Sequence, residues 1–205
     1  SVKVKGASFL IDPENLRMWY ICMYYKLIGE GKKDNPFQVH SLENLIWIKN
    51  NPYYWNKHFK QMKDIKINYE FNFNGNIGNK KTPFTGTYDG NNYYIENLNN
   101  LNKKNYNIGL FGYIKNANIE NVKLLNFNIN GKSNLGSLAG FAENSIISHC
   151  IVKGTISGEY NVGGLIGNSD NTRIISSFAD VLVKSKKYCG LAVGKGNGDI
   201  IDSSS

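Results

Sequence analysis

NIGLFG, which occupies residues 107–112, is the first of four related stretches in this chain of 205 residues. The others are NLGSLAG from Asn134, NVGGLIG from Asn161 and YCGLAVG from Tyr188, and each begins 27 residues after the one before it. A fixed period in this range is typical of repeat proteins, in which one small unit of secondary structure stacks on the next. The sequence therefore predicts a stack of similar coils.

Aligned with one gap in the first copy, the four copies share their apolar positions. The aligned columns are Ile108, Leu135, Val162 and Cys189; Leu110, Leu138, Leu165 and Ala192; Ile119, Ile147, Ile174 and Ile201; and Ile129, Ile156 and Val183. Between them lie short runs rich in β-branched residues and broken by Gly, Asn and Ser, which favours strands over helices. In-register strands ~4.8 Å apart would place each inward residue above its equivalent. We therefore predict an all-β fold, a parallel β-helix (a solenoid of parallel strands) with 27-residue coils.

Glycine and asparagine also recur at fixed places in the copies. Each pair of glycines flanks the apolar pair of its copy, where we expect the chain to bend or a neighbouring strand to come close. The asparagines are expected to form a ladder of side-chain amides, each bonded to its equivalent in the next coil, and Tyr188 breaks this ladder. The residues predicted to build the repeat are Asn107, Gly109, Gly112, Asn134, Gly136, Gly140, Asn161, Gly163, Gly167, Gly190 and Gly194.

The chain divides into three predicted segments. Residues 1–34 form an N-terminal extension without an assigned role, in which Asp12 and Pro13 favour the start of a helix. Residues 35–68 are predicted to form a small cap of one helix and a first strand. Residues 69–205 are predicted to form the β-helix itself, with regular copies from 107, 134, 161 and 188.

The cap is expected to begin with a short strand at Phe37-Gln38-Val39. A helix then starts with Ser41 as its N-cap and ends before Pro52. An amphipathic helix just upstream of the repeats would cover the apolar end of the stack. The aromatic run at residues 53–55 follows it, either as a cluster that stacks on a ligand or, as we favour, as a packing layer beneath the cap.

Several of these stretches resemble a known family. Residues 109–112, 163–167 and 190–194 resemble the GLUG motif, which is named for its Gly-Leu-hydrophobic-Gly core, and residues 137–139 depart mildly from it. Upstream, residues 84–98 resemble the F-x-G-T-x-D-G-N-x-x-x-I-x-N-L run that often precedes such repeats. The resemblance covers about residues 35–205. It implies a right-handed parallel β-helix, as in bacterial surface adhesins and beside the catalytic domain of immunoglobulin-A peptidases, and it implies no active site.

The formal net charge of +8 would suit an acidic partner, but the lysines are dispersed along the sequence. The densest series are Lys57, Lys60, Lys63 and Lys66, and Lys184, Lys186, Lys187 and Lys195, and the chain has only two arginines, Arg17 and Arg173. No nucleic-acid-binding motif accompanies these lysines. The sequence therefore favours a solvated face over a nucleic-acid site.

The sequence offers no pattern for a metal, a cofactor or a disulfide. Cys22, Cys150 and Cys189 are odd in number and far apart, without the spacing of a zinc site. Cys150 and Cys189 fall at apolar positions of the repeat, so both are expected as buried thiols. We predict that the chain binds no metal and no cofactor.

An enzyme is the main rival hypothesis, because some parallel β-helices cleave polysaccharides with carboxylates clustered on adjacent coils. The acidic residues of the copies are expected at different phases of the repeat, so that stacking brings no such cluster together. These residues are Glu120, Glu143, Glu159, Asp170, Asp180, Asp199 and Asp202. The sequence therefore predicts no catalytic residue.

No apolar run approaches the ~20 residues that span a bilayer, since the run from Met18 to Tyr25 is short and flanked by charges. The N-terminal residues also lack the pattern of a secretory signal peptide. We expect no membrane span, and a location either at the cell surface or in a virus particle.

The function predicted from these features is a non-catalytic surface adhesion or structural module. A capsid or tail protein of a virion is the alternative, and a polysaccharide-active enzyme is less favoured. The partner of this chain would be a protein or glycan ligand, or neighbouring subunits of an assembly. The outward residues expected to meet that partner are Lys103, Lys104, Tyr160, Lys186, Lys187 and Tyr188. The last coil, where residues 200–205 align with 173–178, is expected to present an open edge that further repeats or a partner would cover.

Overall fold

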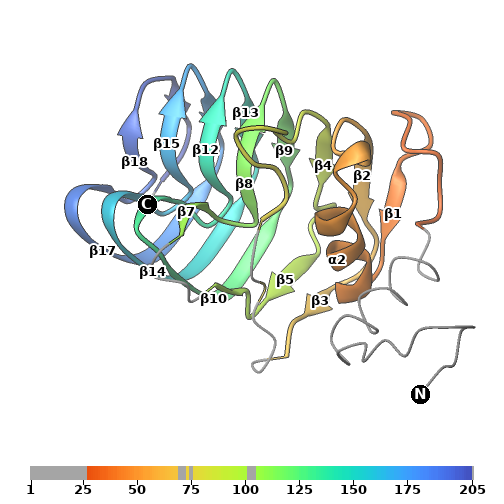
Figure 1. Cartoon of the computed structure of the whole chain (residues 1–205), viewed down its shortest axis with the longest axis horizontal. Coiled ribbons are helices and arrows are strands. Elements are labelled where there is room, and N and C mark those ends of the chain that lie inside the picture. Colours follow the sequence, from red (N-terminus) through yellow and green to blue (C-terminus); the bar gives the residue numbers. More distant parts are fainter. Residues whose placement is uncertain (1–26, 69–72, 74–75, 101–104, 205) are drawn as a thin grey trace, which may run out of the picture.

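Short runs of alternating apolar and polar residues wind into a solenoid of parallel strands (Figure 1). The structure is a computed structural model that describes residues 27–68, 73, 76–100 and 105–204. Every pairing between its named strands is parallel. The fold is therefore the all-β solenoid that the repeat predicts.

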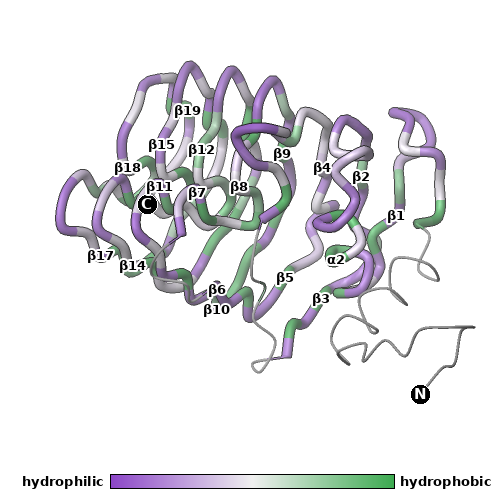
Figure 2. The backbone as a smooth tube through the Cα atoms, in the orientation of Figure 1, coloured by the Kyte–Doolittle hydropathy of each residue, from purple (hydrophilic) through white to green (hydrophobic). Residues whose placement is uncertain are grey.

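Three sheets run along the solenoid. The first orders its strands as β1 (Phe37–Val39), β2 (His58–Gln61), β4 (Thr87–Asp89), β9 (Asn118–Glu120), β13 (Ile146–Ser148), β16 (Arg173–Ile175) and β19 (Ile200–Ile201). The second contains β3 (Ile65–Lys66), β5 (Tyr94–Glu96), β6 (Asn99–Asn100), β7 (Tyr106–Ile108), β10 (Lys123–Asn130), β11 (Ser133–Leu135), β14 (Ile151–Gly163) and β17 (Phe178–Gly190). The third contains β8 (Phe111–Lys115), β12 (Ala139–Glu143), β15 (Ile166–Asp170) and β18 (Val193–Gly196). Figure 2 shows hydrophilic residues concentrated at the turns that connect these sheets.

Residues that share an apolar column of the repeat lie side by side in adjacent coils. Three of these columns are seen in strand pairing: Ile108, Leu135, Val162 and Cys189; Ile119, Ile147 and Ile174; and Ile129, Ile156 and Val183. The fourth, which starts at Leu110, is held at the corners by backbone bonds, such as Leu165 N–H to the Ala192 carbonyl at 2.9 Å. Each inward side chain therefore packs on its equivalent in the next coil.

The last coil departs from the predicted register. Ile174 pairs with Ile200 and not with Ile201, and Phe178 forms a bridge with Ser204. This coil is one residue shorter than the period of 27, so the predicted alignment of residues 200–205 is wrong by one position.

The interior of the early coils is aromatic. The ring centroids of Phe59 and Phe84 lie 6.0 Å apart, and those of Phe84 and Phe111 lie 4.9 Å apart. Tyr88 is fully buried beside them, and its hydroxyl donates a hydrogen bond to Gln61 Oε1 at 3.3 Å. The segments before the regular copies are therefore early turns of the same stack, with a continuous core.

One α-helix occurs in the described part of the chain, α2 (Leu42–Asn50), and it lies near the N-terminal end of the solenoid (Figure 1). It follows strand β1, as predicted, and buries Leu45 and Ile48 completely. Ser41 is its extended N-cap residue but makes no side-chain cap bond. The Asn44 side chain instead accepts a hydrogen bond from the His40 backbone N–H at 2.9 Å.

The aromatic run after α2 is divided between packing and solvent. Its first two residues, Tyr53 and Tyr54, belong to the 3-10 turn η1 (Pro52–Tyr54), and Trp55 follows the turn directly. Trp55 is buried and its Nε1 donates to the Ile48 carbonyl at 2.7 Å, and Tyr54 packs on the Trp47 ring. The packing interpretation therefore holds for Tyr54 and Trp55, whereas Tyr53 is 82% exposed.

The last coil leaves apolar side chains uncovered. Strands β17, β18 and β19 each lie at the end of a sheet or pair on one side only, and Leu182, Leu191 and Ile200 are more than half exposed.

Cys189 lies in this coil and is exposed, so its predicted burial is wrong, because no further coil packs on it in the described chain. Cys150 is buried in an earlier coil, as predicted, and burial raises the pKa of its thiol to about 12.

Some predictions concern residues outside the described part. These are the helix expected from residue 12, most of the run 69–75, and Cys22.

Candidate functional site

Asn107, Asn134 and Asn161 occupy the same corner of successive coils. All three have a left-handed backbone, with φ of 53°, 56° and 52°, and asparagine adopts this conformation more readily than most other residues. Asn134 Nδ2 donates to Asn107 Oδ1, and Asn161 Nδ2 donates to Asn134 Oδ1, each at 2.7 Å. The expected amide ladder is present, and Tyr188, with φ of 60°, takes its next place without an amide.

The second glycine of each of the last three copies, Gly140, Gly167 and Gly194, lies against this ladder. A Cβ at Gly140 would collide with the backbone of Asn107 and Ile108, and a Cβ at Gly167 would collide with the backbone of Asn134 and Leu135. Glycine thus lets the third sheet approach the corner of the preceding coil. The first glycine is also crowded, since a Cβ at Gly109 would lie 2.5 Å from the Gly136 carbonyl oxygen.

A second ladder stands at another corner. Asn171 Nδ2 donates to Asn144 Oδ1 at 2.8 Å, and both residues share a left-handed backbone with Asn116. The sequence analysis missed this ladder, although these three asparagines align once the gap in the first copy is allowed. Both ladders fix the corners of the coils, so the outward side chains beside them hold regular positions.

The outward residues next to the first ladder form a tyrosine-lysine ridge. We define it by Tyr106, Lys132, Ser133, Glu159, Tyr160, Lys186, Lys187, Tyr188 and Lys195. In the second sheet Ser133 pairs with both Tyr106 and Tyr160, and Tyr160 pairs with Lys187, so these residues follow one another along the axis. The side chains of Tyr106, Tyr160 and Tyr188 are 54%, 42% and 47% exposed.

Lysine ammonium groups lie over two of these rings. Lys132 Nζ is 5.5 Å from the ring centroid of Tyr106, and Lys187 and Lys195 Nζ are each 5.0 Å from that of Tyr188. Such cation-π contacts hold a positive charge beside an aromatic face. A hydrogen bond to Tyr106 also raises the pKa of Lys132.

The ridge gathers four of the predicted partner-binding residues and adds others. Tyr160, Lys186, Lys187 and Tyr188 belong to it, whereas Lys103 and Lys104 lie outside the described residues. The sequence analysis missed Tyr106, Lys132 and Lys195. Tyr106 could have been found, because it precedes Asn107 as Tyr160 precedes Asn161. Lys132 gave no signal, and Lys195 stood out only as a member of a lysine series, since only the coiling brings both lysines to the tyrosines.

A second cluster lies on the outer surface of the third sheet. The rings of Tyr113 and Phe141 stack with centroids 4.7 Å apart and an interplanar angle of 10°. The Tyr113 hydroxyl donates to Glu143 Oε2 at 2.8 Å, and Lys115 Nζ lies 2.7 Å from Glu143 Oε1. Partial burial and the Glu143 carboxylate raise the pKa of Tyr113 to about 12. The hydrogen bonds from Lys115 and Tyr113 lower the pKa of Glu143.

Stacking brings some acidic residues together, contrary to the prediction. Glu143 pairs in register with Asp170, and Asp89 pairs with Glu120. These contacts escaped the sequence analysis, although Glu143 and Asp170 are one period apart. In each pair one carboxylate also lies near a lysine: Lys115 with Glu143, and Lys60 with Asp89 at 3.4 Å.

A shallow pocket of about 280 Å³ lies at the corner of the second ladder. It is lined by Asn144, Ser145, Ile146, Asn171, Arg173, Gly198 and Asp199. Arg173 Nε and Asp199 Oδ2 are 3.9 Å apart across it. Within the described ranges, no three His, Cys, Asp or Glu side chains are grouped closely enough to hold a metal ion.

None of the described helices has the length and hydrophobicity needed to cross a bilayer.

The chain matches no protein-family model. Over 116 residues, 55% of the chain, it is 32% identical to halomucin of Haloquadratum walsbyi, and this match spans 1% of the length of halomucin. A crystal structure of a candidate immunoglobulin A1 protease from Bacteroides ovatus aligns with a TM-score of 0.48 and 16% identity, covering 85% of this chain and 76% of that one.

Proposed function

We propose that this chain is a non-catalytic module of an extracellular surface, which holds a binding ridge at fixed spacing. The observation that carries the proposal is the register of the solenoid. Strand pairing places Tyr106, Ser133, Tyr160 and Lys187 in one column, and the amide ladder beside them fixes the corner of each coil. A rigid array of this kind can present several side chains to one partner without the entropy cost of ordering the backbone that carries them.

The similarity to halomucin supports the extracellular part of the proposal. That protein is named as a mucin, and mucins act outside the cell. The GLUG-like pattern of the copies supports the same placement, because the family includes surface adhesins.

The state of the acidic residues supports a non-catalytic role. A carboxylic acid that donates a proton to a glycosidic oxygen needs a raised pKa. The pKa of Glu143 is instead lowered by Lys115 and Tyr113. Asp170, its register partner, is exposed on β15.

Fractionation of the producing organism tests the location. An antibody against this chain should detect it in the fraction released by mild protease treatment of intact cells, with a cytosolic enzyme as the control for lysis. Detection in the cytosol alone would contradict the proposal. Co-sedimentation with virus particles would favour the structural role in a virion.

An activity assay tests the absence of catalysis. The purified chain should release no reducing ends from acidic or neutral polysaccharides. Release that disappears in both Glu143→Gln and Asp170→Asn, while Asp180→Asn retains it, would identify an enzyme.

A further inference from the structure

We propose that the tyrosine-lysine ridge binds an acidic polysaccharide laid along the axis of the solenoid. The inference rests on the proposed function in one respect, since it takes the ridge as the surface that meets the partner. It adds the chemical class of the ligand and the residues that bind it.

The spacing of the exposed rings suits a linear polymer. Tyr106 and Tyr160 are separated by one intervening strand, and two strand spacings amount to about 10 Å. This distance is similar to the length of a disaccharide, so two sugars that are two residues apart in a chain along the axis would each meet one of these two rings. An exposed tyrosine offers an aromatic face for sugar C–H groups and a hydroxyl for a hydrogen bond.

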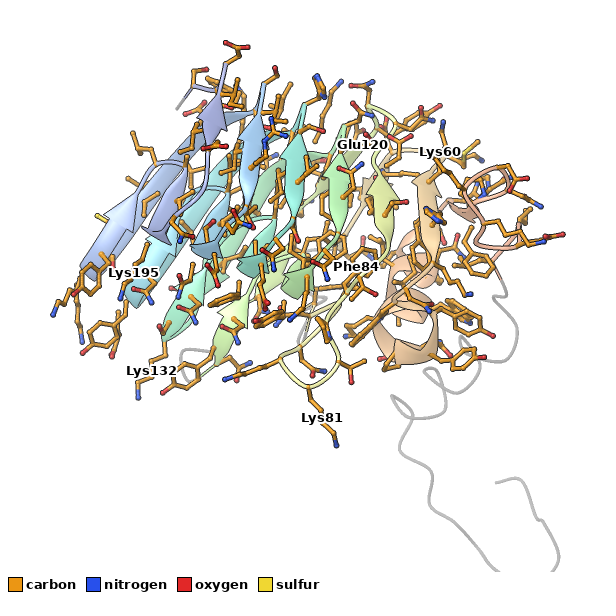
Figure 3. All side chains as sticks on the ribbon, turned by 90° about the horizontal axis from the view of Figure 1, so that it is seen from above. Lys60, Lys81, Phe84, Glu120, Lys132 and Lys195 are labelled. Atoms are coloured by element: carbon orange, nitrogen blue, oxygen red, sulfur yellow. The ribbon has the colours of Figure 1, made fainter. Side chains whose placement is uncertain are left out.

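The charge of the ridge selects an acidic ligand. Lys186 Nζ lies 3.1 Å from Glu159 Oε1, so the carboxylate of the ridge is already paired. Lys132, Lys187 and Lys195 have ring contacts, and none of them forms an ion pair with a described carboxylate. Figure 3 shows Lys132 and Lys195 projecting along the same edge of the molecule, away from the edge that carries Lys60 and Glu120. The ridge therefore presents a row of ammonium groups to carboxylate or sulfate groups of a polymer.

Neutral polar groups lie between the charges. Ser133, Asn134 and Asn161 are half-buried at the base of the ridge, next to the exposed rings. Hydroxyl and amide groups can donate to and accept from sugar hydroxyls. The half-buried hydroxyl and amide groups beside the rings favour a polysaccharide, whose hydroxyls they can bond. Single-stranded DNA, whose bases also stack on aromatic rings, is the competing ligand in the test below.

Isothermal titration with defined polymers tests the inference. The probes are heparin and hyaluronan oligosaccharides as acidic polysaccharides, dextran as a neutral one, and single-stranded DNA. The chain should bind at least one acidic polysaccharide, with an affinity that falls as the salt concentration rises. Tyr160→Ala and Lys187→Ala should each weaken this binding about tenfold, the effect of ~1.4 kcal/mol. The controls are Tyr53→Ala and Lys63→Ala, which alter an exposed tyrosine and an exposed lysine far from the ridge and should change nothing.

Three results would overturn the inference. These are the absence of binding to every acidic polysaccharide at low salt, equal losses in the ridge and control variants, and tighter binding of DNA than of the polysaccharides. Circular dichroism of each variant shows whether it remains folded, and the additional variant Tyr160→Phe should retain binding because it keeps the ring. Failure here would leave the proposed surface location intact, because fractionation tests that location separately.

Discussion

The corner asparagines combine a left-handed backbone with a side-chain bond to the next coil. Asn134 has φ of 56°, donates to Asn107 and accepts from Asn161. Replacement by glycine keeps the left-handed backbone conformation accessible but removes both amide hydrogen bonds. This loss should lower the free energy of unfolding by about 1–2 kcal/mol. Replacement by alanine removes the same two bonds and keeps a Cβ in the left-handed region without the local hydrogen bonding that lets asparagine tolerate it, which should cost about 1–2 kcal/mol more than replacement by glycine.

Urea denaturation of Asn134→Gly and Asn134→Ala measures the two contributions separately. Both variants should be less stable than the parent, and the alanine variant should be the less stable of the two. Equal stability of all three proteins would show that neither the ladder nor the backbone conformation stabilises the coil.

The raised pKa of Tyr113 predicts a dependence of stability on alkaline pH. Its pKa is about 12 in the folded chain, against ~10 for an unperturbed tyrosine. The folded state therefore holds the proton more tightly, so this contribution is complete below pH ~10 and is lost as the pH rises towards 12. The parent should lose stability more steeply across this range than Tyr113→Phe, as measured by urea denaturation at a series of pH values.

The matched control is Tyr53→Phe, which removes the hydroxyl of a side chain that is 82% exposed. Its pH dependence should follow the parent. An identical slope for Tyr113→Phe and the parent would contradict the raised pKa of the Tyr113 hydroxyl.

Single residues could be predicted from sequence where the period alone determines their surroundings. The bond between Asn107 and Asn134 follows from equal position in adjacent coils. The burial of Cys189 could not be predicted in this way, because burial depends on whether another coil lies above. The contacts of Lys132 and Lys195 with tyrosine rings also depend on side-chain directions across a turn, which a one-dimensional pattern does not contain.

At the scale of the strand, the glycines of the third sheet control how closely two coils pack. A Cβ at Gly140 meets backbone atoms of Asn107 and Ile108, which cannot move aside as a flexible side chain can. Gly140→Ala should therefore destabilise the chain by about 3 kcal/mol or more, at or beyond the upper end of ordinary overpacking.

Thermal unfolding followed by circular dichroism checks this effect. The control is Asn168→Ala on the neighbouring strand β15, where the side chain is half-buried and points outward, and where a change within about 0.5 kcal/mol is expected. A native melting temperature for Gly140→Ala would show that the two coils can separate without cost.

The elements themselves were largely predictable, since short β-branched runs between glycines and asparagines formed the expected strands. The strand at Phe37–Val39 and the helix that follows it were also predicted from local signals. The register of β19 was not, because a coil that is one residue shorter still carries two adjacent isoleucines, and either could have continued the column. Pairing with Ile174 selects Ile200.

At the scale of the molecule, the period predicts that whole coils can be removed. Deletion of residues 134–160 joins Ser133 to Asn161, as Ser133 is now joined to Asn134. Every column and the amide ladder would keep their alignment, so the shortened chain should fold, with lower stability because one interface between coils is lost.

The control deletion removes residues 134–146, about half a coil, and joins a strand of the second sheet to a segment of the first. It should give an unfolded or aggregated product, because its inward and outward residues no longer match their neighbours. Circular dichroism and size-exclusion chromatography of both products distinguish these outcomes. Loss of structure in the whole-coil deletion would contradict the modular account of the fold.

The direction of the backbone hydrogen bonds has a mechanical consequence. In parallel sheets these bonds run from strand to strand, and here the strands succeed one another along the solenoid (Figure 1). A pulling force applied between the two ends would therefore load one coil at a time instead of shearing many bonds together. Each regular coil that detached would add about 27 residues of extended chain to the length of the protein. Under tension the protein would lengthen in steps and dissipate work, as an extensible tether does.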